Sequence, residues 1–169
     1  LNILMIKQLK IFFAIFLCLA ASRFLPHPGN FTSLIALSFY VPAILGLRYI
    51  PFLILSFAIT DFIIGYHNLT HWTWGSVFLI GFLPLYFKNT IKLRISGAMT
   101  GAVIFFLLTN FGVWLSGIYG YSLEGLLACY TLAIPFFTSS LISTFLFSII
   151  IEWVYYTFKS KFHNFSKIY

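Results

Sequence analysis

The sequence predicts an all-α fold: a polytopic membrane protein built as a bundle of six transmembrane helices, with both chain ends in the cytoplasm. Three observations lead to this prediction. The 169 residues are 61% hydrophobic and only 8% charged, whereas a soluble domain usually carries about 25% charged residues. The apolar residues form runs about as long as a bilayer is thick. The basic residues lie at the ends of these runs, as in membrane proteins and not as in a nucleic-acid-binding surface.

The apolar runs define the expected spans of a single membrane domain, residues 1–169. A bilayer core about 30 Å thick is crossed by roughly 17 to 25 helical residues. The expected spans are residues 6–25, 31–47, 51–66, 72–87, 95–115 and 136–158. A shorter apolar run, 122–134, is followed by Pro135, and proline interrupts helical hydrogen bonding. We interpret this run as a short interfacial helix packed on the bundle.

The basic residues give the expected orientation, because cytoplasmic segments of membrane proteins are enriched in lysine and arginine. With the N-terminus in the cytoplasm, the outer segments contain only Arg23 of the ten basic residues. The cytoplasmic ones are Lys7, Lys10, Arg48, Lys88, Lys92, Arg94, Lys159, Lys161 and Lys167. We interpret them as long side chains that reach towards the membrane surface. Apart from these residues, the cytoplasmic half contains few polar side chains.

Polar side chains that could hold a ligand gather at the outer face in this topology. They come from the first outer loop, from the outer end of the third span with its following loop, and from the outer end of the fifth span. The candidate ligand-binding residues are Arg23, His27, Asn30, Asp61, His67, Asn110 and Trp114.

Asp61 is the most informative of these residues, because it lies about five residues inside the outer end of its span, where an unpaired carboxylate is costly. Arg23, at a similar depth in the first span, is the expected partner. Two interpretations stay open: the pair fixes the packing of the helices, or one or both side chains contact a ligand. The two are compatible.

The sequence offers little support for an enzyme. No serine–histidine–acid set, phosphate-binding loop or carboxylate pair falls on one side of the predicted bundle, and Glu152 lies on the opposite face from the other two acidic residues. His67 and His71 have helical metal-ligand spacing, but no further ligand completes a site. We therefore expect no enzyme, no catalytic residues, no metal and no cofactor.

The first span has small side chains at every fourth position, Ala14, Cys18 and Ser22. Small residues at this spacing let another helix approach closely. We expect these residues to form a helix-docking face, towards either the bundle itself or a separate protein.

Five stretches resemble the motifs of an uncharacterised family of predicted bacterial membrane transport proteins. They are residues 23–32 (RFLPHPGNFT), 61–67 (DFIIGYH), 109–117 (TNFGVWLSG), 125–130 (GLLACY) and 134–137 (IPFF). That family is similar in turn to the substrate-binding S-components of energy-coupling factor (ECF) transporters. The resemblance implies a six-helix protein of the bacterial inner membrane that binds a vitamin-like micronutrient from outside, with the first outer loop closing over it. It also implies a partner, a transmembrane coupling subunit with ATPases, although Cys18 stands where S-components typically have alanine.

We expect a membrane-embedded binding subunit for uptake of a small solute, with membrane lipid, a small-molecule ligand and the coupling subunit as partners and no nucleic acid. The alternative is a structural or assembly subunit, whose outer residues would contact other subunits of a larger membrane complex.

Overall fold

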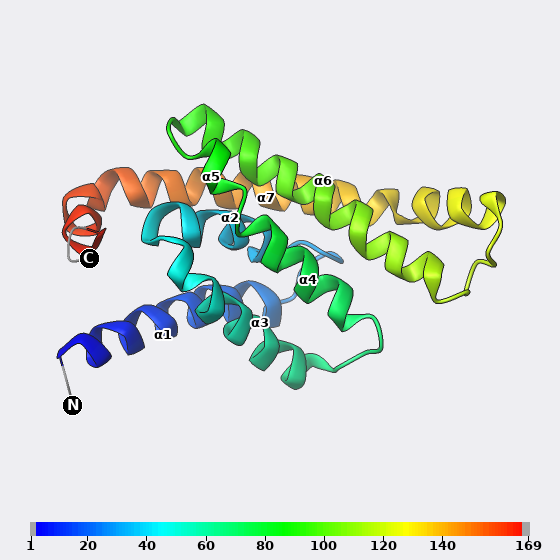
Figure 1. The fold of residues 1–169 in the computed structure, drawn as a ribbon, viewed down its shortest axis with the longest axis horizontal. Helices are drawn as coiled ribbons and strands as arrows, with labels where there is room; N and C mark the ends of the chain where they lie inside the picture. Colours follow the sequence, from blue (N-terminus) through cyan, green and yellow to red (C-terminus); the bar gives the residue numbers. More distant parts are fainter. Residues whose placement is uncertain (1–2, 167–169) are drawn as a thin grey trace.

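The computed structural model describes the backbone of residues 3–166 and the side chains of residues 5–158. Throughout this part of the chain the regular structure is helical, which confirms the predicted all-α class. The helices are α1 (Ile3–Phe24), α2 (Leu34–Leu45), η1 (Leu47–Tyr49, a 3-10 helix), α3 (Ile50–Ile64), α4 (Thr70–Ile80), α5 (Pro84–Phe87), α6 (Ile91–Leu115) and α7 (Leu123–Ser166) (Figure 1). Lys167 and the side chains of Lys159 and Lys161 lie outside the described residues.

Among the described residues, four helical stretches are long and apolar enough to cross a membrane. They are Met5–Phe24, Leu47–Ile64, Ile91–Leu115 and Leu123–Phe158, which overlap the first, third, fifth and last predicted spans. The other two predicted spans are shorter helices. The span predicted at 31–47 is the 12-residue α2, which covers about 18 Å. The span predicted at 72–87 is divided between the 11-residue α4 and the four-residue α5, so six full-length spans are not confirmed.

Proline and glycine explain where these two helices stop. Pro84 begins α5, where a helix start tolerates proline, and the chain turns between Gly81 and Leu83 before it. Gly46 ends α2 with a φ of 104°, a conformation that residues with a Cβ rarely adopt. The residues before α2 form the loop that holds Pro26 and Pro28, so α2 begins only at Leu34.

The predicted break at Pro135 is wrong, because residues 122–134 and 136–158 belong largely to one continuous helix, α7. Proline has a backbone φ compatible with a helix and removes a single N–H donor. In apolar surroundings the remaining helical hydrogen bonds have no water to compete with them. The apolar part, Leu123–Phe158, has 36 residues and extends about 54 Å. The hairpin of α6 and α7 consequently projects beyond the other helices (Figure 1).

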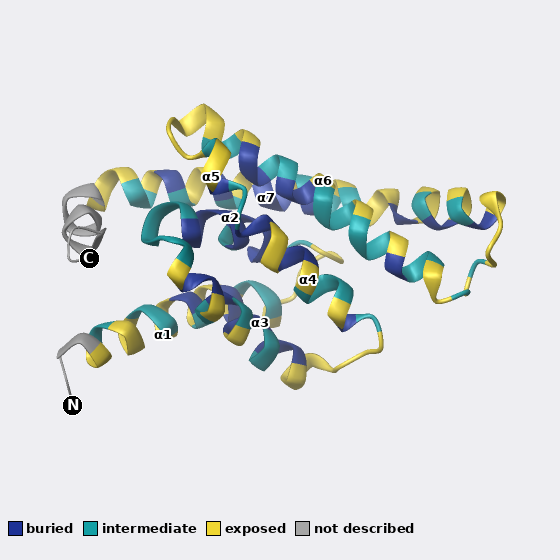
Figure 2. Cartoon of the chain, viewed as in Figure 1, coloured by how far each residue is buried: buried dark blue, intermediate teal, exposed yellow. Residues whose placement is uncertain are grey.

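The helix α2 lies at the centre of the bundle and belongs to both hydrophobic clusters of the core. In one cluster Leu34 and Val41 of α2 pack with residues of α1, α3 and α4. In the other, Phe39 and Tyr40 pack with residues of α4 and α6. The dark blue of buried residues in Figure 2 is concentrated on α2 and the helix faces around it, and yellow marks much of the outer surface.

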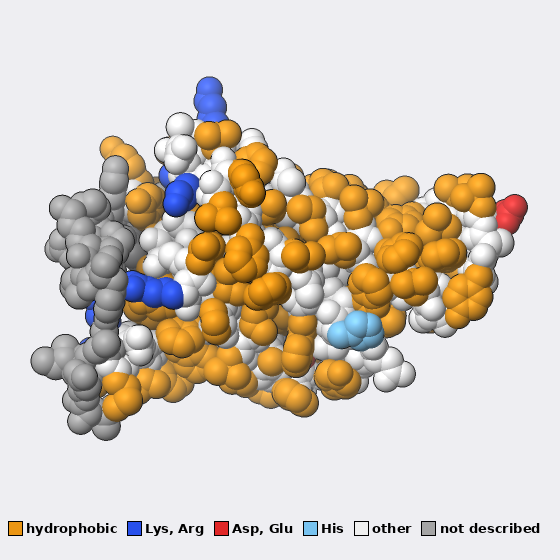
Figure 3. Space-filling model, viewed as in Figure 1, with side chains coloured by type: hydrophobic (Ala, Val, Ile, Leu, Met, Phe, Trp, Pro, Cys, Tyr) orange, Lys and Arg blue, Asp and Glu red, His pale blue; other side chains and the backbone are white. Residues whose placement is uncertain are grey.

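Small residues on α6 let the core helices approach it closely. A Cβ on Gly97 would overlap the ring of Phe39, and a Cβ on Gly101 would lie 3.0 Å from Ile80. Figure 1 shows that α1 begins and α7 ends on the same side of the molecule. In the view of Figure 3, the lysine and arginine side chains gather near this side, and an acidic side chain lies at the far tip of the hairpin.

Candidate ligand-binding site

Arg23, near the end of α1, and Asp61, on α3, form the ion pair that the sequence predicts. Arg23 Nη2 lies 2.6 Å from Asp61 Oδ1, and the side chains are 14% and 10% exposed. Charges so far removed from water need hydrogen bonds for their remaining atoms. The pairing is therefore confirmed, while contact of either residue with a ligand stays a prediction.

Neighbouring side chains supply those further hydrogen bonds. Trp74, on α4, donates its indole N–H to Asp61 Oδ2 over 2.7 Å. Arg23 Nη1 donates to the hydroxyl of Thr60, and the guanidinium carbon lies 4.6 Å from the centroid of the Phe57 ring. The network thus connects α1, α3 and α4. Sequence reasoning missed Trp74 and Thr60 as partners, because no short motif relates Trp74 to a carboxylate on another helix.

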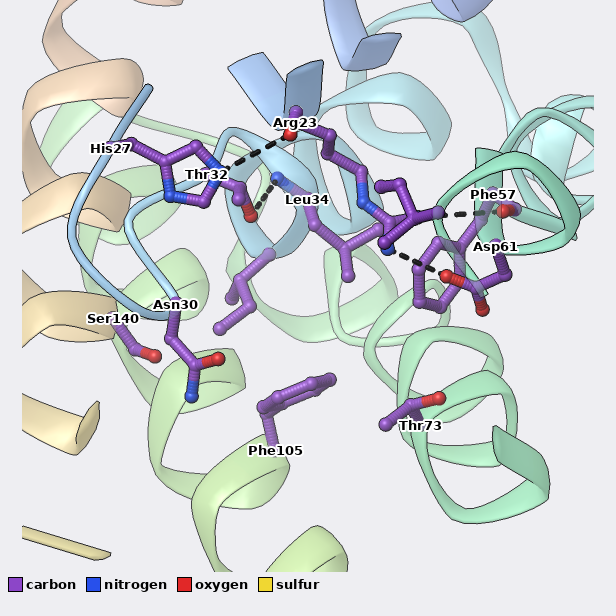
Figure 4. Close-up of a pocket in the computed structure, with 12 residues that line it drawn as sticks. Arg23, His27, Asn30, Thr32, Leu34, Phe57, Asp61, Thr73, Phe105 and Ser140 are labelled. Atoms are coloured by element: carbon purple, nitrogen blue, oxygen red, sulfur yellow. Dashed lines mark hydrogen bonds and ion pairs between the residues drawn. The ribbon is translucent and has the colours of Figure 1, made fainter. Parts of the chain in front are cut away.

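A cavity of about 240 Å³ opens beside this ion pair, beneath the loop that joins α1 to α2. Its walls include side chains from α2, α3, α4, α6 and α7 as well as from the loop. Four of the seven predicted ligand-binding residues line it: Arg23, His27, Asn30 and Asp61. Figure 4 shows them with Thr73, Phe105 and Ser140 around the same space. The fold therefore brings together residues that are up to 38 positions apart in this set.

The loop between α1 and α2 covers the cavity and is held by local contacts. His27 Nδ1 lies 2.7 Å from the Pro28 carbonyl oxygen, and Nε2 lies 3.3 Å from that of Arg23, so the imidazole braces the loop. Asn30 has a φ of 62°, a left-handed conformation that asparagine tolerates better than most residues. A Cβ on Gly29 would lie 2.9 Å from Phe136 of α7, so glycine permits close packing of the loop there.

A second cavity, of about 210 Å³, adjoins the first and extends between α6 and α7. The two share Asn30, Thr73, Phe105 and Ser140 among their lining residues. Asn110, another predicted ligand-binding residue, lines the second cavity, where its amide donates 2.8 Å to the Phe106 carbonyl. The two adjoining cavities together form the candidate site, with the ion pair lining the first and Asn110 lining the second.

His67 and Trp114, the remaining predicted ligand-binding residues, do not line either cavity. His67 belongs to the turn before α4, where its carbonyl accepts a 2.6 Å hydrogen bond from Thr70 Oγ1. Trp114 packs between Phe111 and Tyr121 near the tip of the α6–α7 hairpin. Both lie on elements adjacent to the site, which is why position in the sequence alone grouped them with it.

The predicted docking residues of α1 have two different environments. Ala14 and Cys18 are exposed. Ser22 is half-buried, and its hydroxyl lies 2.7 Å from that of Ser33 at the start of α2. Ser22 therefore takes part in packing within the bundle, whereas Ala14 and Cys18 leave an open face.

The other end of the bundle contains a second ion pair, Arg94 with Glu152. The sequence did not predict it, because Arg94 was interpreted as a side chain that reaches towards the membrane surface. Arg94 of α6 donates to both carboxylate oxygens of Glu152 of α7, from Nε over 2.7 Å and from Nη2 over 2.6 Å. The hydroxyl of Tyr40 on α2 donates to the same carboxylate over 3.0 Å. The interval between Arg94 and Glu152, 58 residues, gave no local signal of the pairing.

Comparison with known proteins gives a family but no function. The sequence model of a family of unknown function, DUF6580, matches residues 5–165. No curated protein and no solved structure shows a significant match.

Proposed function

The chain belongs to DUF6580, a family of unknown function, and we propose that it is a membrane-embedded binding subunit for uptake of a small solute. The observation that supports this proposal most strongly is the pair of adjoining cavities beneath the α1–α2 loop. Small-molecule sites are typically concave and mostly apolar, with a few converging polar groups. Both cavities have this character, and five predicted ligand-binding residues line them.

The position of the loop supports a role in closing the site. It connects α1 and α2 directly above the first cavity, contributes His27 and Asn30 to its wall, and packs on α7 at Gly29. Solute would enter from the side of the membrane on which this loop lies. We place that side outside a bacterial inner membrane, because lysine and arginine are concentrated towards the other end of the bundle.

The resemblance to ECF S-components extends the proposal to a vitamin-like micronutrient and to a coupling subunit with ATPases. The exposed Ala14 and Cys18 on α1 are the face we propose for that subunit. Small side chains permit close helix–helix approach within a membrane, where van der Waals packing drives association.

A role as an assembly subunit of a larger membrane complex is the second candidate. It is favoured by the projecting tip of the α6–α7 hairpin, where Ile118, Tyr121 and Leu123 are each at least 67% exposed. Other subunits could cover these side chains. Isolation discriminates the two functions: an assembly subunit should purify only with the same partners in fixed stoichiometry, whereas a binding subunit should also be stable alone.

The direct test is native mass spectrometry of the purified chain, with Asp61→Asn and Arg23→Ala beside the wild type. We expect a small molecule to copurify with the wild type and to be largely lost from both variants. Glu124→Gln is the matched control for loss of a carboxylate, because Glu124 is exposed and lines neither cavity. Equal occupancy in Asp61→Asn, Arg23→Ala and the wild type would contradict the proposed site.

A further inference from the structure

The charged groups of the candidate site are already matched to one another. Arg23 and Asp61 contribute one positive and one negative charge, and no other lysine, arginine, aspartate or glutamate lines either cavity among the described residues. Asp61 accepts from Arg23 and Trp74, one on each oxygen. Arg23 donates to Asp61 and Thr60 through its two terminal nitrogens. A charged solute would thus find no unmatched lysine, arginine, aspartate or glutamate in these walls, and both ring nitrogens of His27 already face backbone carbonyl oxygens.

The polar groups that remain available are neutral. Ser140 is 3% exposed, lines both cavities, and its hydroxyl makes no hydrogen bond to any residue that the structure describes. The carboxamide of Asn30 likewise has no partner in the described chain and lies between Ser140 and Phe105 in Figure 4. Ser140 is almost enclosed, so a ligand that hydrogen-bonds to its hydroxyl is favoured over one that leaves this hydroxyl unpaired. Asn30 is exposed, so its carboxamide is accessible to the same ligand from the loop.

The apolar walls next to these groups are aromatic. Phe105 lines both cavities, and Phe106, Phe136 and Phe137 line the second. The rings of Phe106 and Phe137 are stacked, with centroids 4.3 Å apart. Aromatic side chains favour offset-stacked or edge-to-face contact with another ring. This half of the site is therefore suited to a flat, ring-shaped group.

We infer that the solute is an uncharged planar ring compound with an amide-like polar group, which hydrogen-bonds to Asn30 and Ser140 where the two cavities meet. This inference deepens the proposed function and rests on it. An amide donates and accepts hydrogen bonds, so it matches a free carboxamide and a free hydroxyl together. An anion would lie beside Asp61, and a cation beside Arg23, and either would have to disrupt the pair or stay uncompensated at low dielectric.

The effect of ligand charge on affinity can be measured with three compounds of nearly the same shape. Benzamide is neutral, benzoate is an anion and benzamidinium is a cation. We would measure their binding to the purified chain in nanodiscs by ligand-observed NMR, with empty nanodiscs as the blank. Benzamide is expected to bind at least about tenfold more tightly than either ion, since an uncompensated buried charge costs more than about 1.4 kcal/mol.

Variants test the assigned hydrogen bonds. Asn30→Ala and Ser140→Ala should each weaken benzamide binding roughly three- to tenfold, the effect of one neutral hydrogen bond. Asn68→Ala is the matched control, because Asn68 is an exposed asparagine in the loop before α4 and lines neither cavity. It should leave the affinity unchanged, and an equal loss in Asn68→Ala and Asn30→Ala would overturn the assignment of Asn30.

The outcomes separate this inference from the proposed function. Tighter binding of benzoate or benzamidinium, weakened by Arg23→Ala or Asp61→Asn, would overturn the inferred solute class and leave a solute-binding site in place. A copurified solute that carries a net charge would do the same. Failure of all three compounds to bind overturns the inferred class, and if no small molecule copurifies either, the proposed function is contradicted as well.

Discussion

The two ion pairs of this protein have similar distances and burial but different surroundings. Arg23 and Asp61 meet through one 2.6 Å contact and share their other hydrogen bonds with Thr60 and Trp74. Arg94 and Glu152 meet through two contacts, at 2.6 and 2.7 Å, with Tyr40 as a third member. The first network connects α1, α3 and α4 at one end of the candidate site and lines the same cavity as Asn30 and Ser140, whereas the second connects α2, α6 and α7.

From this difference we propose a binding role for the first pair and a structural role for the second. Arg94 also donates 3.1 Å to the carbonyl of Lys88, so it fixes the turn between α5 and α6 as well as the contact with α7. A cavity of about 580 Å³ adjoins this pair, but residues of the loop that precedes α6, Lys88, Asn89 and Thr90, form much of its wall. We therefore expect the second pair to govern stability. The first should govern ligand affinity indirectly, because the loss of either partner leaves an unmatched charge in the wall of a site that we infer takes a neutral solute.

The largest expected effect on stability comes from Glu152→Gln. The substitution leaves Arg94 poorly exposed and without a counter-charge, and removal of one partner from a buried pair costs about 3–5 kcal/mol. Because a cavity next to the pair can admit water, we expect the free energy of unfolding to fall by about 3 kcal/mol, the lower end of this range. Denaturant unfolding of the detergent-solubilised protein measures this loss.

The double variant Arg94→Leu/Glu152→Leu is the control for Glu152→Gln, since it removes both charges. It should unfold at a higher denaturant concentration than Glu152→Gln. A Glu152→Gln protein as stable as the wild type would show that this pair does not hold the core helices together.

Asp61→Asn should destabilise the protein less, by about 2 kcal/mol. The new carboxamide oxygen can still accept a hydrogen bond from Arg23 or from Trp74, although the charge of Arg23 loses its partner. The same unfolding experiment compares the two variants directly. A loss larger than that of Glu152→Gln would reverse the structural roles assigned to the two pairs.

Trp74→Phe removes the indole N–H that binds Asp61 and preserves most of the aromatic surface. Hydrogen bonds to charged groups contribute about 1.5–3 kcal/mol, and the partial exposure of Trp74 favours the lower end of this range. Trp72→Phe is the matched control, because no hydrogen bond from the Trp72 indole to Asp61 is present. Equal stability of Trp74→Phe and the wild type would mean that this contact contributes nothing.

Gly29→Ala should have the smallest effect, under about 1 kcal/mol on unfolding, because the Phe136 ring can shift by a few tenths of an ångström. Its larger consequence should be a faster release of bound solute, since the loop would pack less closely on α7. Gly75→Ala is the control, as a Cβ there meets nothing within 4 Å. An unchanged release rate would show that the loop does not retain the solute.

The sequence predicted the membrane class and the Arg23–Asp61 pair because both depend on strong, simple physics. A charge-poor chain needs an apolar solvent, and a carboxylate inside an apolar helix needs a partner. The grouping of Asn30 and Asn110 around adjoining cavities followed from placing both at the outer face of the bundle. To make these predictions it was enough to know in which direction each helix runs through the bundle; how the helices pack was not needed.

The features that the sequence did not predict depend on contacts between segments that are distant in the chain. Pro135 indicated a helix end, but the continuous α7 shows that the apolar surroundings outweigh local propensity there. Ser140 is one of several serines and threonines on α7, and only the fold shows that it faces both cavities. Arg94 and Glu152 carry no short-range signal of their pairing.

The measurement that tests this account most directly compares solute occupancy in Asp61→Asn and Glu152→Gln, purified identically and kept below their unfolding temperatures. Native mass spectrometry gives the fraction of each protein that carries the copurified small molecule. We predict that most of the Asp61→Asn protein carries no small molecule, which corresponds to an affinity at least about tenfold weaker than that of the wild type. The affinity of Glu152→Gln should stay within about twofold of the wild-type value. Full occupancy in Asp61→Asn, or an equal loss in both variants, would contradict the separation of a binding pair from a structural pair.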